Sequence, residues 1–174
     1  MLKSFKSWWT EDSAVIAVEV GLLVPAMLTI MMGVIDTGVG VLTSQKVINS
    51  VQTVGDLLGR EESVSTEILN NCVEAGKLGM MPYETTTFGV DVAGIKFVGG
   101  PGNPTVVWRD TINMDPNADI LIKAEGLGAA DEGVLGVTVR YVYHPYFSGI
   151  LSGDIAINEV SYVRGRKGLF IPRV

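Results

Sequence analysis

The residues whose types could carry catalysis are few, and their spacing matches no known active site. The only histidine, His144, lies in a Tyr-His-Pro-Tyr segment, far along the chain from the only cysteine, Cys72. An activated nucleophile needs a base within hydrogen-bond reach and a third group that orients the base. The sequence also contains no G-x-S-x-G motif. We therefore predict that His144 and Cys72 are packed or surface residues, and that the protein is not an enzyme.

The sequence does not clearly encode a site for a metal ion or a phosphate group. The glycine-rich segment 99–102 lacks the Lys-Ser/Thr pair that follows a phosphate-binding loop, so we interpret it as a turn. A single cysteine excludes an internal disulfide and a CxxC zinc site. We predict no cofactor. A calcium site within residues 115–136 is left open, because four acidic residues lie there at a spacing that matches no calcium loop: Asp115, Asp119, Asp131 and Glu132.

The charge pattern argues against nucleic-acid binding. The net charge is −6, from 19 acidic and 13 basic side chains. The acidic residues, Asp91 among them, are scattered along the chain, which predicts a solvated acidic surface. Binding to phosphates requires clustered Lys and Arg. The only basic cluster is short and C-terminal: Arg164, Arg166 and Lys167.

A carboxylate inside a long apolar run is the most informative feature. Residues 14–35 contain a single charge, Glu19, and about 20 apolar residues suffice for a helix to cross a bilayer. A carboxylate at the centre of a membrane helix costs ~2.5–3.5 kcal/mol and is usually retained for a function. Two interpretations stay open. Glu19 is a tolerated charge near the interface, or, after a cut between Ala14 and Val15, it pairs with the new α-amino group of a neighbouring subunit.

The residues around the apolar run predict its orientation. Lys3 and Lys6 precede the run, so the N-terminus is expected to stay in the cytoplasm and the remainder to be exported. Trp8 and Trp9 stand where interfacial aromatic residues are expected. A secretory signal peptide has a shorter apolar region of about 7–15 residues. We predict a basic leader at residues 1–14, a transmembrane segment at 15–36 and an extracytoplasmic domain at 37–174.

The start of the apolar run resembles a known family. It reads Ala14-Val-Ile-Ala-Val-Glu19-Val-Gly-Leu-Leu-Val-Pro25 and ends in Gly33-Val-Ile-Asp36. This pattern is similar to TadE/TadG-like pilus-assembly proteins, which have a short basic leader, AVEFALVxP and an apolar stretch that ends in G-I-x-[DE]. The resemblance extends from about Asp12 to Leu58. Ala14 stands where the family usually has glycine, so both a cleaved and an uncleaved, signal-anchored form stay open.

The resemblance implies a minor pseudopilin of the Tad (tight adherence) branch of type IV pilus systems, anchored in the bacterial inner membrane with a periplasmic domain. It implies a prepilin-peptidase cut between Ala14 and Val15, a pairing role for Glu19, and as partners a prepilin peptidase, other pilin or pseudopilin subunits and the Tad platform proteins. Independently of the resemblance, Pro25 removes one helical hydrogen bond and favours a kink. The alternative function is a signal-anchored exported binding or scaffold protein of a secretion or adhesion apparatus that does not enter a filament.

Helical spacing predicts that residues 37–82 are mainly helical. Apolar residues recur every three or four positions up to Leu58, and Gly59 is a natural end for the helix. A second helix is expected at residues 66–78, capped by Ser63 or Ser65. The Met residues that follow it are expected to fill gaps in the core.

Alternating patterns predict that residues 85–165 are mainly strands. We expect strands at 87–97, with a bulge at Gly94, and at 105–109, 137–143 and 154–163. Residues 118–124 fit a short helix or a strand, and the glycine-rich stretch up to residue 136 reads as a loop. The predicted fold class is α+β, with a long N-terminal helix and a short second helix packed on one face of a roughly four-stranded antiparallel, pilin-like sheet.

Overall fold

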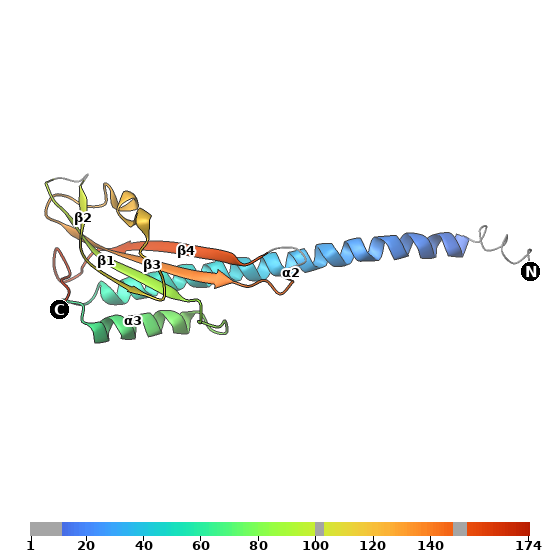
Figure 1. The fold of residues 1–174 in the computed structure, drawn as a ribbon, viewed down its shortest axis with the longest axis horizontal. Helices are drawn as coiled ribbons and strands as arrows, with labels where there is room; N and C mark the ends of the chain where they lie inside the picture. Colours follow the sequence, from blue (N-terminus) through green and yellow to red (C-terminus); the bar gives the residue numbers. More distant parts are fainter. Residues whose placement is uncertain (1–11, 100–102, 148–152) are drawn as a thin grey trace, which may run out of the picture.

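The computed structural model describes residues 12–99, 103–147 and 153–174. Lys3, Lys6, Trp8, Trp9 and most of the predicted leader lie outside these residues. A helix that projects beyond a folded domain dominates the shape (Figure 1). The elements are α2 (Asp12–Leu58), α3 (Thr66–Gly79), β1 (Gly89–Phe97), β2 (Pro104–Ile112), the short 3-10 turns η1 (Ala118–Ile120) and η2 (Ile122–Ala124), β3 (Gly133–Tyr143) and β4 (Ile155–Val163).

The long helix α2 has 47 residues, which corresponds to ~70 Å at 1.5 Å per residue. It continues through Pro25, where the hydroxyl of Thr29 donates to the Pro25 carbonyl oxygen at 2.9 Å. The predicted kink at Pro25 stays a prediction. The helix ends at Leu58, and the backbone N–H of Gly59 donates to the Gly55 carbonyl at 2.8 Å. The predicted C-terminal end of the helix is confirmed.

The second helix, α3, begins where the sequence predicts. Of the two candidate caps, Ser65 fills the role, because its hydroxyl accepts from the backbone N–H of Ile68 at 3.2 Å. The prediction for the following Met residues is half correct. Met80 is fully buried, whereas Met81 is 63% exposed, because the chain turns away from the core after the helix ends.

The four strands form one antiparallel sheet in the order β2-β1-β3-β4. The predicted bulge is confirmed: Gly94 pairs with Trp108 and Ile95 with Val106, which leaves one extra residue on β2. Glycine is needed there, because a Cβ on Gly94 would lie 2.2 Å from Nε1 of Trp108.

One prediction for the second half of the chain needs revision, and one open choice is settled. Residues 133–136 were expected to be loop but begin β3, the strand that pairs with both β1 and β4. Pairing with β1 along all four residues, and with β4 from Leu135 onward, outweighs the poor strand propensity of the two glycines there. For residues 118–124, the short-helix alternative is confirmed and the strand is not, because the segment forms the two 3-10 helices η1 and η2. Ile120 of η1 is buried against the outer face of the sheet.

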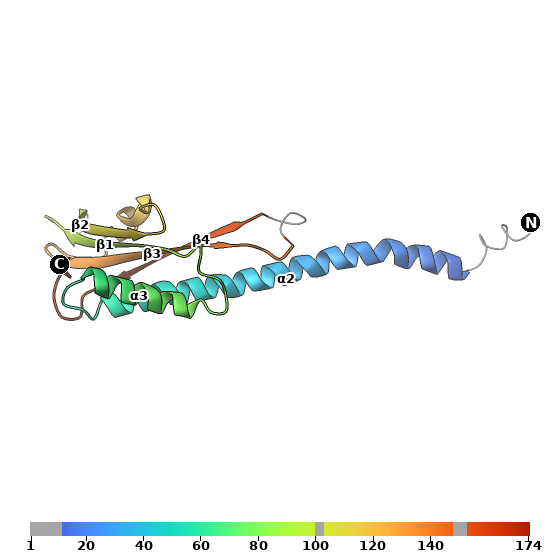
Figure 2. The same cartoon turned by 60° about the horizontal axis from the view of Figure 1, so that its bottom comes forward.

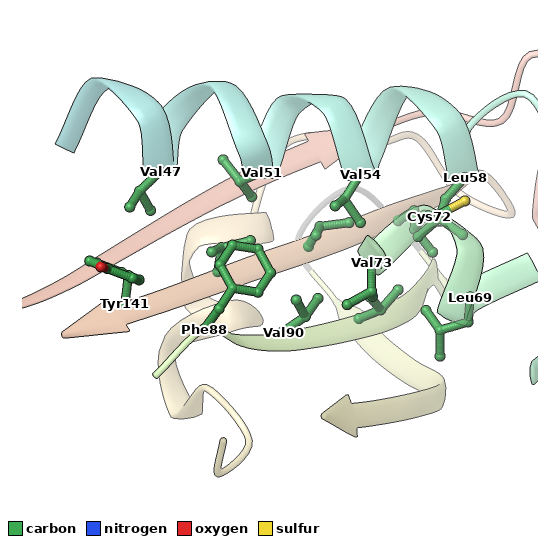
Figure 3. Close-up of a cluster of buried hydrophobic side chains, with 14 of the residues drawn as sticks. Val47, Val51, Val54, Leu58, Leu69, Cys72, Val73, Phe88, Val90 and Tyr141 are labelled. Atoms are coloured by element: carbon green, nitrogen blue, oxygen red, sulfur yellow. The ribbon is translucent and has the colours of Figure 1, made fainter. Parts of the chain in front are cut away.

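Both helices cover one face of the sheet, which confirms the α+β prediction (Figure 2). The main core lies between the helices and β1 and β3 (Figure 3). The C-terminal half of α2 directs a row of apolar side chains into it at spacings of three or four residues. The buried side chains labelled there come from α2 (Val47, Val51, Val54, Leu58), α3 (Leu69, Cys72, Val73) and the sheet layer (Phe88, Val90, Tyr141).

Asp91 is an exception to the predicted solvated acidic surface. Asp91 on β1 is fully buried. It accepts from Nε of Arg109 at 2.8 Å and from the backbone N–H of Asn117 at 2.9 Å. The hydrogen bond to Asp91 raises the pKa of Arg109. This buried charge is tolerated because it is paired, and the pair fixes the chain that crosses from β2 to β3.

Candidate functional site

The N-terminal half of α2 carries more than half of the exposed large apolar side chains in the part of the chain that the structure describes. Every side chain from residue 15 to residue 31 is exposed, and Leu22 retains 75% of its accessible surface. An 18-residue window of this helix has a mean hydropathy of 2.2 with none of it buried. Apolar area left in water costs about 25 cal/mol per Å². The helix is thus long and apolar enough to cross a membrane, and it has no covering within the described chain.

The predicted site residues lie on this exposed segment. Ala14 and Val15 are both within α2, so the predicted cut would fall inside a helical turn near its start. Val15 and Glu19 are four residues apart and therefore share one face of the helix. Pro25 lies six residues further, also exposed. The structure brings these residues onto one segment but leaves their predicted roles untested.

A second feature, which the sequence analysis missed, marks the end of the exposed segment. Asp36 is 7% exposed, although its neighbours on either side in the sequence are exposed. Its carboxylate accepts from the backbone N–H of Tyr146 at 2.9 Å and from that of Phe147 at 3.1 Å. The hydroxyl of Tyr143 donates to the Asp36 carbonyl oxygen at 3.3 Å. Asp36 therefore fastens the segment after β3 to the helix.

Burial raises the pKa of Tyr143, and the charge of Asp36 adds to the effect.

An open groove of about 410 Å³ lies beside the contact between Asp36 and Tyr143, between α2 and the ends of β3 and β4. Its lining is mainly apolar and includes Gly40 and Val41 of α2, Tyr143 at the end of β3, Pro145 after it, and Ile155 and Ile157 of β4. The sequence signal was present as an acidic residue at the end of an apolar run, but its partners are more than 100 positions away.

The residues considered for chemistry are engaged in structural contacts. Nδ1 of His144 lies 2.7 Å from Oδ1 of Asp154, and both side chains are more than half exposed. Cys72 is buried in the core, and burial raises the pKa of its thiol, which disfavours the reactive thiolate. Among the described residues, no group of three His, Cys, Asp or Glu side chains could hold a metal ion.

The C-terminal basic residues each face an acidic partner. Arg164 lies 3.1 Å from Glu132, and the guanidinium of Arg166 lies 3.1 Å from Asp56. Lys167 lies 3.4 Å from Glu62. These exposed pairs are worth little in stability. The acidic partners compensate the positive charge of this C-terminal basic cluster.

The fold and the exposed segment define a class of protein: an α+β domain carried on one long N-terminal helix whose first half is a candidate membrane span. Residues 14–55 match the family model described as TadE-like protein, which confirms the resemblance that the sequence showed from about Asp12 to Leu58. The match covers the exposed half of α2 and most of its buried half. Searches of curated proteins and of solved structures returned no match.

Proposed function

We propose that this protein is a minor pseudopilin that takes part in the assembly of a Tad-type pilus. Residues 15–36 anchor it in the inner membrane, and residues 37–174 form a periplasmic domain. The observation that carries the proposal is the division of α2: one half completes the core of a domain, while the other half is apolar on every side and exposed. The TadE-like match over residues 14–55 supports the assignment to a pilus system.

The proposed assembly interface includes the N-terminus created by a prepilin peptidase. The family match begins at Ala14, next to the proposed cut before Val15. Glu19 would then be the fifth residue of the mature chain. A carboxylate in the bilayer is costly alone. An α-amino group from a neighbouring subunit compensates this charge and favours packing of the two apolar helices side by side.

The proposed partners follow from this role. They are the inner membrane, other pilin or pseudopilin subunits, the prepilin peptidase and the Tad platform proteins. The role needs neither catalysis nor a cofactor, which agrees with the structural, pilus-related character of the TadE-like family. Nucleic acid is not a proposed partner, because the C-terminal basic residues face acidic side chains.

A second candidate function is a signal-anchored exported binding or scaffold protein that does not enter a filament. Ala14, in place of the glycine that is usual before the cut, favours this alternative. Intact-mass measurement of the protein made with and without its prepilin peptidase distinguishes the two. We expect the peptidase to remove residues 1–14. A retained Met1 in a functional protein supports the anchored alternative instead.

Substitution of Glu19 tests the pairing. We expect Glu19→Ala to impair pilus assembly strongly while leaving membrane insertion intact, because an apolar residue inserts more readily than a carboxylate. Membrane fractionation and counts of assembled pili measure the two effects separately. Glu67→Ala, which removes an exposed carboxylate outside the apolar segment, is the matched control and should assemble normally. Normal pili in Glu19→Ala would refute the pairing role.

A further inference from the structure

The contact between Asp36 and the chain after β3 holds a distinct part of the domain at the end of the apolar segment. We call this part the hairpin tip and define it as residues 143–147 together with Ile155. The backbone N–H groups of Tyr146 and Phe147 donate to the Asp36 carboxylate, and the Tyr143 hydroxyl donates to its carbonyl. These bonds come from both the side chain and the backbone of one helical residue. The tip therefore cannot slide along α2 without losing them.

The length of the apolar segment gives the depth of the tip. Residues 15–35 span about 31 Å at 1.5 Å per residue, which matches a hydrocarbon core of about 30 Å. Asp36 then lies at the boundary between hydrocarbon and headgroups. The headgroup layer on each side is about 5–8 Å thick, which corresponds to the helix from Asp36 to about Gly40. The two N–H donors bonded to Asp36 must lie within this layer.

The side chains of the tip suit such a layer. Tyr146 is 73% exposed, and Ile155 is also exposed although it lies at the start of a strand. Tyr is enriched at membrane–water interfaces because its ring is apolar and its hydroxyl remains hydrated. The segment from His144 to Ile157 contains no Lys or Arg. Attraction to anionic lipid is therefore not part of the contact.

We propose that the hairpin tip rests in the headgroup layer of the membrane that α2 crosses, with Tyr146 and Ile155 against phospholipid. This inference depends on the proposed membrane anchoring of residues 15–36. The apolar surface is continuous, because the exposed apolar side chains of α2 extend past Asp36 to Val41, which lines the mainly apolar groove beside the tip. The membrane contact gives the domain a second support besides α2. It fixes how the sheet is oriented relative to the bilayer before assembly.

Depth-dependent quenching of a fluorescent probe tests the contact in the full chain. The probe is attached to the variants Tyr146→Cys, Leu169→Cys and Met27→Cys, each in a Cys72→Ala background. The protein is reconstituted in phosphatidylcholine vesicles at less than one copy per vesicle, with a nitroxide quencher attached to the lipid headgroup or to the acyl chain. Leu169 is the matched control, since it is 72% exposed and lies beside Gly133 at the far end of β3. That end is about 33 Å from Tyr143 along the strand.

We expect the headgroup quencher to reduce the fluorescence of the Tyr146 probe several-fold more than that of the Leu169 probe. The acyl-chain quencher should act mainly on Met27. If the Tyr146 and Leu169 probes behave alike while Met27 is quenched, the tip contact is wrong and the anchor stands. If Met27 is not quenched, both proposals fail. If protection of the residue-146 probe from solvent appears only at several copies per vesicle, a second copy of the protein covers the tip, and the proposed lipid contact is wrong.

Removal of the hydrogen bonds between Asp36 and the hairpin tip gives an independent test. Asp36→Ala deletes the acceptor for both N–H groups, so we expect the Tyr146 probe to lose most of its headgroup quenching while the Met27 probe is unchanged. Thr37→Ala, at the exposed neighbouring residue, is the matched control and should retain the quenching. Full quenching of the Tyr146 probe in Asp36→Ala would show that Asp36 does not position the tip.

Discussion

The two halves of α2 are both rich in Val, Leu and Ile, yet they have opposite surroundings. Side chains from residue 15 to residue 31 are all exposed, whereas Val47, Val51, Val54 and Leu58 are almost completely buried. In the second half, the apolar residues recur on one face, and polar residues occupy the other. In the first half, apolar residues occupy every face.

This difference shows what each half requires. A helix with one apolar face is satisfied by a sheet and a second helix on that side. A helix that is apolar all round needs apolar surroundings on every side, such as a membrane or other membrane helices. Asp36 lies at the boundary between the two halves, where it hydrogen-bonds to the end of β3 and the segment after it.

The largest expected difference between the halves is in the cost of truncating a leucine. Leu58 is fully buried, so Leu58→Ala should lower the free energy of unfolding by about 2–5 kcal/mol through lost burial and a cavity. Leu22→Ala, on the exposed half, should change it by less than about 0.5 kcal/mol. Urea unfolding of the full chain in detergent micelles measures both. Equal effects would show that the exposed half also supports the domain.

Substitution of glycines also distinguishes the buried half of α2 from the exposed half. A Cβ on Gly76 of α3 would lie 2.5 Å from Cγ2 of Val54, so Gly76→Ala should separate α3 from α2 and destabilise the domain by about 1–3 kcal/mol. Gly21, on the exposed half, has nothing within 4 Å of such a Cβ, so Gly21→Ala should cost nothing. Urea midpoints of the two variants decide the matter. A stable Gly76→Ala protein would mean that the helices repack easily.

The smallest expected effect is at the junction between the halves. Tyr143→Phe removes the hydrogen bond to Asp36 and should cost about 0.5–1.5 kcal/mol near neutral pH. Because the pKa of Tyr143 is raised in the folded protein, the unfolded chain ionises first, near pH 10. The stability that Tyr143 contributes is therefore complete below about pH 10 and falls as pH rises through its folded pKa.

Unfolding curves of the wild-type and Tyr143→Phe proteins, measured from neutral pH to above pH 10, test this prediction. The difference between the two should shrink as the phenol ionises. Other tyrosines titrate as well; burial raises the pKa of Tyr162, for example, to about 12. These tyrosines are present in both proteins, so their contributions cancel in the difference between the two free energies of unfolding. A difference that does not vary with pH would argue against a role for the Tyr143 hydroxyl.

Much of the architecture could be predicted from local patterns. The end of α2 at Leu58, the start of α3 at Thr66 and the bulge at Gly94 follow from apolar spacing, capping residues and alternation. The first four residues of β3 could not be predicted, because glycine has a low strand propensity and only pairing with β1, joined by β4 from Leu135 onward, makes them a strand. Asp91 was expected on the surface for a similar reason: its partner Arg109 lies on another strand.

The long apolar helix, its length and the place where its character changes all follow from the amino-acid sequence. These properties depend on composition and on spacing over a few residues, so they can be read locally. The contacts of each charged or small residue, by contrast, depend on the three-dimensional fold. Asp36 is the clearest case, because its hydrogen-bond partner Tyr146 is 110 positions away. A carboxylate at the end of an apolar run is visible in the sequence, but its role depends on which distant backbone the fold brings to it.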